Sequence, residues 1–162
     1  MVINESETVV KKVIEVSVPI AHAFDVFTRR IDLWWPRSHH IGKAEMKEAV
    51  LEGQDGARWY ERGVDGSECT WGRVLVWSPP RHVALSWQID VQWQFEPNPD
   101  KASRIDVRFS AIDGVRTRVE LEHSLLDRHG TGWEKMKEAI ASQGGWQAML
   151  DAFGVKAVDA AA

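Results

Sequence analysis

Three groups of residues in this sequence could take part in chemistry: one histidine in an alternating row, two adjacent histidines and two glutamates. His123 ends a row in which alternate residues face one side of a strand, so we expect its imidazole to reach a buried pocket. The alternative is a core histidine that bonds to the backbone or to a carboxylate. If Glu61 and Glu68 converged on His123, the three could act as the acid and base of a cyclase or lyase.

Metal and nucleophile chemistry find little support. His39 and His40 follow the sequence WWPR, where a loop could cap a pocket, but adjacent residues point in different directions and rarely chelate one metal. The chain has no H-E-x-x-H, His-x-His or cysteine pair, so we expect no metal site. It also lacks G-x-S-x-G, G-x-G-x-x-G and P-loop motifs, so neither a hydrolase nucleophile nor a cofactor is implied.

Tryptophan is unusually abundant, with nine residues against one tyrosine. The nine occupy positions 34, 35, 59, 71, 77, 87, 93, 133 and 146, so nearly every predicted element contributes one. Such rings either fill an ordinary core or line a cavity for an apolar or aromatic ligand, and both interpretations stay open. Either Tyr60 or its neighbours Trp59 and Glu61 face inward, not all three, and the sequence does not decide which.

A set of strands and helices has to position these residues. Val9 to Val18 alternates and predicts a first strand, which Pro19 ends. Helical spacing then predicts a helix from Pro19 to about Thr28, followed by a short helical turn to Trp35. From Met46 to Ser124, turn signals separate six strand-like runs, which predicts an antiparallel meander.

Apolar rows in these strands indicate which side faces the core. In one strand Ile105, Val107 and Phe109 face inward, and charged residues alternate with them on the solvent side. A second row is predicted to run without a break through Val83, Leu85, Trp87, Ile89, Val91, Trp93 and Phe95.

Helical spacing returns after Gly130, but its apolar phase breaks. The first face carries Trp133, Met136 and Ile140, and the second carries Trp146, Met149, Leu150 and Phe153. One straight helix cannot present both faces to one core, so we predict two helices, over 132–142 and 145–158, separated by Gly144 and Gly145. The second helix would cover a curled sheet and leave a pocket at the seam.

Composition limits the classes of protein that need to be considered. With 162 residues, the chain has the length of a single domain, 1–162, and could bury about 70% of its unfolded surface. The net charge of −4, without a basic stripe, argues against nucleic acid as a partner. A single cysteine, Cys69, fits a reducing compartment, and there is no apolar run for a signal peptide or a membrane span. We therefore expect a cytoplasmic protein, with the oligomeric state left open, a homodimer included.

Several segments together resemble a known superfamily. They are VSVPIAHAFDVFT, DLWWPRSHHIG, WGRVLVWSPPRHVALSW, TRVELEHSLL and GGWQAMLDAF, which span roughly residues 8–158. They resemble the SRPBCC or START-like superfamily, of birch-pollen-allergen type, and most closely its bacterial branch related to the activator of the Hsp-90 ATPase. The segment HGTGWEKMKEAIASQ is an addition to the simplest pattern.

The resemblance implies an α+β helix-grip fold: a curved antiparallel sheet of six to seven strands around a long C-terminal helix, with two short helices after the first strand. It also implies a small hydrophobic or aromatic ligand between sheet and helix. We predict that the ligand is lined by Trp35, Trp71, Trp87, Trp93, His123, Trp146, Met149 and Phe153. The alternatives are a polyketide-type cyclase, aromatase or hydrolase on the same scaffold, or a chaperone-interacting protein.

Overall fold

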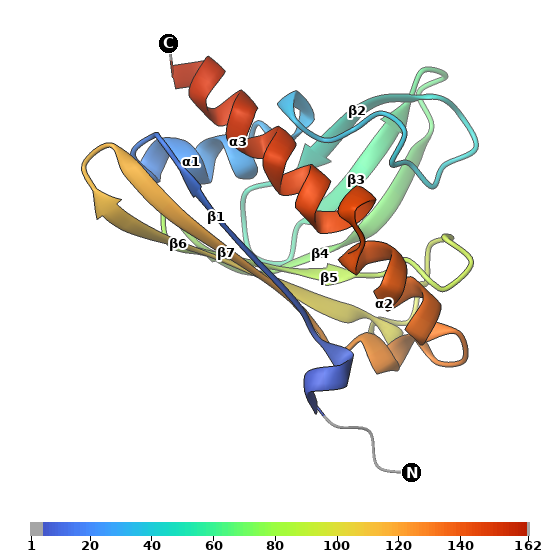
Figure 1. Ribbon diagram of the computed structural model, residues 1–162. Helices are drawn as coiled ribbons and strands as arrows, with labels where there is room; N and C mark the ends of the chain where they lie inside the picture. The colour runs from blue at the N-terminus through green and yellow to red at the C-terminus, as the bar shows by residue number, and fades with distance from the viewer. Residues whose placement is uncertain (1–4, 162) are drawn as a thin grey trace.

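A single antiparallel sheet forms the framework of the protein, in a computed structural model that describes residues 5–161 (Figure 1). Its seven strands lie in the order β1-β7-β6-β5-β4-β3-β2. They are β1 (Val10–Val16), β2 (Met46–Leu51), β3 (Arg58–Gly63), β4 (Glu68–Ser78), β5 (His82–Trp87), β6 (Ser103–Asp113) and β7 (Arg116–Ser124). The predicted meander of six strands is confirmed, and the first strand closes the sheet by pairing with the last.

Helices occupy the inner side of the sheet. The three α-helices are α1 (Ile20–Phe27), α2 (Trp133–Ala141) and α3 (Ala148–Ala161). Short helical turns form at η1 (Glu5–Thr8), η2 (Ile31–Leu33), η3 (Pro99–Lys101), η4 (Leu126–His129) and η5 (Gln143–Gln147). Helix α3 runs across the concave side of the sheet, between β1 at one edge and β2 at the other (Figure 1). The predicted α+β helix-grip fold is thus confirmed. None of the helices in residues 5–161 is long and apolar enough to span a bilayer.

The break between the two C-terminal helices is where the apolar phase predicts it. Gly145 has a non-helical backbone (φ −91°, ψ −131°) inside the wide turn η5. A Cβ atom on Gly145 would lie 2.3 Å from the carbonyl oxygen of Ile140, so only glycine fits there without a shift. The turn lets Met136 and Ile140 of α2 and Met149 of α3 all reach the core.

One predicted inward row ends early. Val83, Leu85 and Trp87 face the core, but the strand stops at Trp87. The backbone then turns back at Asp90, whose N–H donates to the carbonyl oxygen of Gln94. Ile89 is still buried, and Val91 packs partly buried against the core. Trp93 in this turn has a positive φ of 61°, and both Trp93 and Phe95 are exposed, so the predicted continuation of the row is wrong at these two residues. A polar turn residue has overridden the apolar alternation.

A bulge between β3 and β4 brings Trp71 beside two inward-facing residues of β3. Trp59 pairs with Gly72, whereas Tyr60 pairs with Thr70, so Trp71 is the extra residue of the bulge. Trp59 and Glu61 point inward, because the indole of Trp71 contacts Trp59 and donates to the Glu61 carboxylate. Tyr60 points to the other side of the sheet, where the guanidinium of Arg58 covers its ring at 4.0 Å. The sequence leaves open which residues of this strand face inward, and the structure shows that Trp59 and Glu61 do, whereas Tyr60 faces outward.

Candidate functional site

A cavity of about 400 Å³ lies between the sheet and the kinked C-terminal helices. Strands β4 and β5 supply one wall, the turn between α2 and α3 supplies the opposite wall, and the loop after η2 lies at the rim. The lining consists of Trp35, Ser38, His39, His40, Ile41, Trp71, Trp87, Ile89, Trp93, Ala139, Ile140, Ser142, Gly144, Gly145, Trp146 and Met149. Five of these sixteen residues are tryptophans, which makes the wall rich in aromatic rings.

Of the eight residues predicted for the pocket, six lie in this lining: Trp35, Trp71, Trp87, Trp93, Trp146 and Met149. The other two are buried behind it. Phe153 packs in the core, with its ring centre 5.1 Å from that of Phe27. His123 has no exposed surface and contacts the cavity wall through the rings of Trp87 and Trp146.

The tryptophan rings of the wall hold one another. The ring of Trp35 lies 4.7 Å from Trp71 and 6.3 Å from Trp146, and the ring of Trp87 lies 6.1 Å from Trp146. Three of these indoles have an acceptor: Trp35 donates to the His39 carbonyl, Trp71 to Glu61 and Trp146 to His123. The buried Nε1 of Trp87 has no acceptor among residues 5–161. Trp35, Trp71 and Trp146 are therefore fixed by both packing and hydrogen bonds.

His123 belongs to a directional chain of hydrogen bonds behind the wall. An indole N–H can only donate, so the 3.1 Å bond from Trp146 makes Nδ1 of His123 the acceptor. The proton of His123 is therefore on Nε2, which donates to Ser103 Oγ at 2.7 Å. The hydroxyl of Ser103 in turn donates a hydrogen bond to Nε2 of His129, also at 2.7 Å. Burial, with a smaller effect from His129, lowers the pKa of His123 from 6.5 to about 3, so its ring is neutral.

The hypothetical acid and base formed by Glu61, Glu68 and His123 is not assembled. Glu68 lies on the outer side of the sheet, where it accepts hydrogen bonds from Arg58 and Arg62 that lower its pKa. The lone pair of His123 is occupied by Trp146. The three side chains therefore do not converge, because Glu68 is exposed at the start of β4 and points away from the core.

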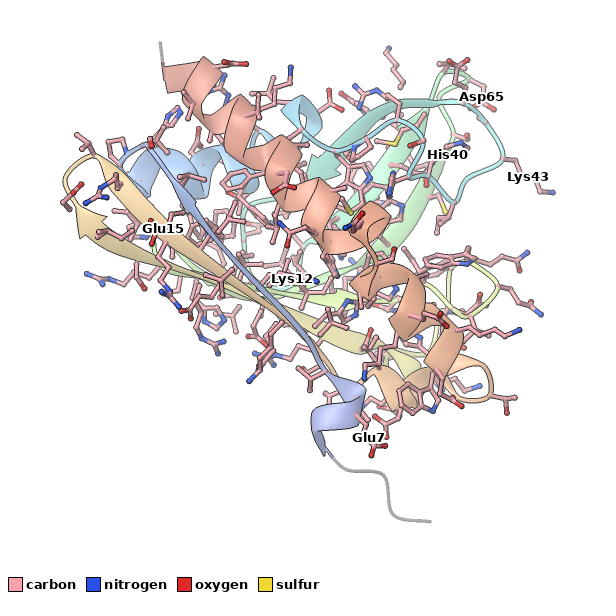
Figure 2. All side chains as sticks on the ribbon, in the orientation of Figure 1. Glu7, Lys12, Glu15, His40, Lys43 and Asp65 are labelled. Atoms are coloured by element: carbon pink, nitrogen blue, oxygen red, sulfur yellow. The ribbon has the colours of Figure 1, made fainter. Side chains whose placement is uncertain are left out.

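Glu61 instead holds the loop at the rim of the cavity. Its side chain is only 2% exposed, and Oε1 accepts hydrogen bonds from the backbone N–H groups of Ile41 (2.6 Å) and Gly42 (3.0 Å). On the same loop, the His39 ring lies 3.2 Å from the carbonyl oxygen of Gly144, across the cavity rim. Figure 2 shows the neighbouring His40, which lies on this loop beside Glu61 of β3.

Sequence reasoning missed much of the rim. Ile41, Ser142 and Gly145 belong to the lining although no motif marks them as site residues. The glycine pair was a usable signal, because a broken helix leaves space on its concave side. The position of His39 and His40 after WWPR was a second signal, and both line the cavity. In residues 5–161, no three or more His, Cys, Asp or Glu side chains group closely enough to hold a metal ion.

A curled antiparallel sheet that grips a C-terminal helix, with an apolar cavity at the seam, defines the helix-grip class. The chain belongs to the family of Activator of Hsp90 ATPase homolog 1-like proteins, whose family model matches residues 17–155. The resemblance seen in the sequence is thereby confirmed. No curated protein matches the sequence.

Solved structures similar to this chain come from several kinds of protein. An anthrahydroquino-γ-pyrone synthase, Txn09, complexed with SUM, is 39% identical, with 93% of this chain and 98% of that chain covered and a TM-score of 0.66. The self-sacrificing resistance protein CalC from Micromonospora echinospora is 26% identical, with 95% and 96% covered and a TM-score of 0.68. Protein NE0264 from Nitrosomonas europaea, at 13% identity and a TM-score of 0.69 with 98% and 99% covered, shares the fold.

Proposed function

We propose that this protein binds a small, flat aromatic molecule in the cavity between the sheet and the C-terminal helices. The observation that carries the proposal is a cavity of about 400 Å³ with five tryptophans in its wall. This volume lies within the range of about 300–1,000 Å³ that is usual for small-molecule sites. Aromatic walls favour aromatic ligands, because stacked and edge-to-face ring pairs add to the effect of burying apolar surface.

One of the similar structures supports the same class of ligand. The name of the 39% identical synthase describes a product with fused aromatic and pyrone rings. A catalytic role on the same scaffold is the second candidate, and one feature of the cavity rim, His40, favours it. A chaperone-directed role has no comparable support among the residues described.

Isothermal titration calorimetry with anthraquinone, naphthol and β-tetralone would test the proposal. We expect saturable binding by at least one of these probes. Met149→Trp should weaken that binding at least tenfold, because Met149 lines the cavity and the larger ring would fill it. The matched control is Val155→Trp, on the same helix but 61% exposed, which should bind as the wild type does. Binding by none of the probes, or equal binding by the Met149→Trp variant, would refute the proposal.

A further inference from the structure

His40 is a cavity-lining histidine whose hydrogen bonds leave one ring nitrogen free. Its Nδ1 lies 2.9 Å from the carbonyl oxygen of Gly42. A carbonyl oxygen can only accept, so Nδ1 carries a proton, and in the neutral ring Nε2 then carries the lone pair. Nε2 has no hydrogen-bond partner among residues 5–161, and the ring lines the cavity. A neutral imidazole with a free Nε2 beside a bound ligand is the arrangement of a general base.

The neighbouring His39 does not have this property, although it lines the same cavity. Its Nε2 lies 3.2 Å from the carbonyl oxygen of Gly144 and must therefore be the donor in that bond. Its Nδ1 lies 3.1 Å from the hydroxyl of Ser38, which can donate to it. Both ring nitrogens of His39 are thus engaged, whereas Nε2 of His40 is not.

Glu61 is placed to support a base at His40. Oε1 of Glu61 is occupied by the N–H groups of Ile41, Gly42 and Trp71, which fixes the carboxylate and the loop together. Oε2 lies 4.0 Å from Nδ1 of His40, too far for a hydrogen bond but close enough for charge attraction. The carboxylate therefore lies beside the ring that would take up the proton. In a catalytic triad the carboxylate accepts a hydrogen bond from the base, whereas Glu61 can act on His40 only through its charge and through the loop that it holds.

We propose that His40 is a catalytic general base that removes a proton from carbon in a bound aromatic ketone, and that Glu61 is its positioning residue. This inference rests on the aromatic ligand proposed above. Nε2 takes the proton from the carbon next to the carbonyl, and the electron pair of that C–H bond moves into the carbonyl to form an enolate. The imidazolium carries the gained positive charge and the enolate the negative charge. Return of a proton from His40 restores the ketone, so no oxidant or reductant is required.

Hydrogen–deuterium exchange would detect this step. β-Tetralone, a bicyclic aromatic ketone, is incubated with the full chain in D₂O, and deuterium incorporation beside its carbonyl is followed by NMR. We expect the wild-type protein to accelerate exchange above the buffer rate. His40→Gln should lower the catalysed rate about 100-fold or more, the usual contribution of a general base, without changing the affinity for β-tetralone by more than about threefold.

A second variant separates charge from loop structure. Glu61→Gln keeps an acceptor oxygen for the N–H groups of Ile41 and Gly42 but removes the charge, so we expect kcat for exchange to fall about tenfold while KM stays the same. A purely structural role of Glu61 would raise KM instead. The control is His22→Gln, outside the cavity lining, where the ring bonds to the Ala157 carbonyl and exchange should not change.

Calorimetry on the same samples distinguishes the two proposals. Binding of β-tetralone without catalysed exchange would refute the base at His40 and leave the ligand-binding proposal intact. Undiminished exchange in the folded His40→Gln variant would also refute it. If none of the aromatic probes binds, both proposals fail.

Discussion

Trp59 and Trp87 offer a sensitive test of the hydrogen bonds around the cavity. Both indoles are buried in the same cluster, with ring centres 5.9 Å apart. Nε1 of Trp59 donates to the carbonyl oxygen of Ser86 at 2.9 Å, whereas Nε1 of Trp87 has no acceptor among residues 5–161. Replacing each tryptophan by phenylalanine removes a similar ring volume. The two variants differ in that Trp59→Phe also breaks a hydrogen bond, whereas Trp87→Phe breaks none among residues 5–161.

The expected difference follows from the cost of an unpaired buried group. Trp59→Phe removes a donor and leaves the Ser86 carbonyl without it, whereas Trp87→Phe removes a donor that has no acceptor. A buried unpaired polar group costs about 1–3 kcal/mol, so Trp59→Phe should lower the free energy of unfolding by about 1–3 kcal/mol more than Trp87→Phe does. At about 3 °C per kcal/mol for a chain of this size, the melting temperatures should differ by about 3–9 °C.

Urea unfolding followed by far-UV circular dichroism measures this difference without depending on tryptophan fluorescence. Both variants should unfold with the same m-value, which shows that the folded and unfolded states remain comparable. If Trp87→Phe is as destabilising as Trp59→Phe, the Trp87 indole must have a partner, such as a buried water molecule, and the reasoning is wrong.

Two further predictions concern the kink and the buried histidine. Gly145→Ala should lower the free energy of unfolding by about 1–3 kcal/mol in the same urea assay, because its Cβ would lie 2.3 Å from the Ile140 carbonyl oxygen. The control is Gly144→Ala, which has open space around its Cβ and should change the free energy of unfolding by no more than about 0.5 kcal/mol. Burial holds the pKa of His123 at about 3, below its ordinary 6.5, so the unfolded chain binds a proton between these values that the folded chain does not. The free energy of unfolding should therefore fall as pH decreases from about 6.5 toward 3, by up to about 1.4 kcal/mol per pH unit, and His123→Asn should flatten this slope. An equal slope in both proteins would contradict the burial argument.

Periodicity was sufficient for most of the fold because burial in a sheet or helix follows its repeat. Thr117, His123 and the apolar residues between them on one face of β7 are all buried, as alternation predicts. The phase change around Gly145 likewise identified a real break. Prediction failed at Asp90, where a side-chain carboxylate accepts from the N–H groups of Gln92 and Gln94 and stabilises a turn that apolar alternation cannot reveal.

The site was less predictable because it depends on contacts between distant segments. The bulge that makes Trp71 the extra residue between two strands arises from pairing, which a single strand pattern does not encode. The hydrogen bond from the backbone N–H of Ile41 to Glu61 connects two residues that are 20 positions apart, and Ile41 lies in an irregular loop. Sequence reasoning could identify Glu61 as a candidate acid, but its position 4.0 Å from Nδ1 of His40 became apparent only when the loop was placed.

The hydrogen bonds around the cavity suggest how its ligand would be selected. Trp35, His39 and Trp146 all direct their polar atoms to other protein groups, so their cavity-facing surfaces are mainly apolar. Affinity should then follow the aromatic area of the ligand, since few wall groups remain to bond to its polar substituents. Orientation, by contrast, would depend on the few free polar atoms, of which Nε2 of His40 is one. Under the two proposals, binding strength and reactivity depend on different residues, and substitutions in the two sets should alter them independently.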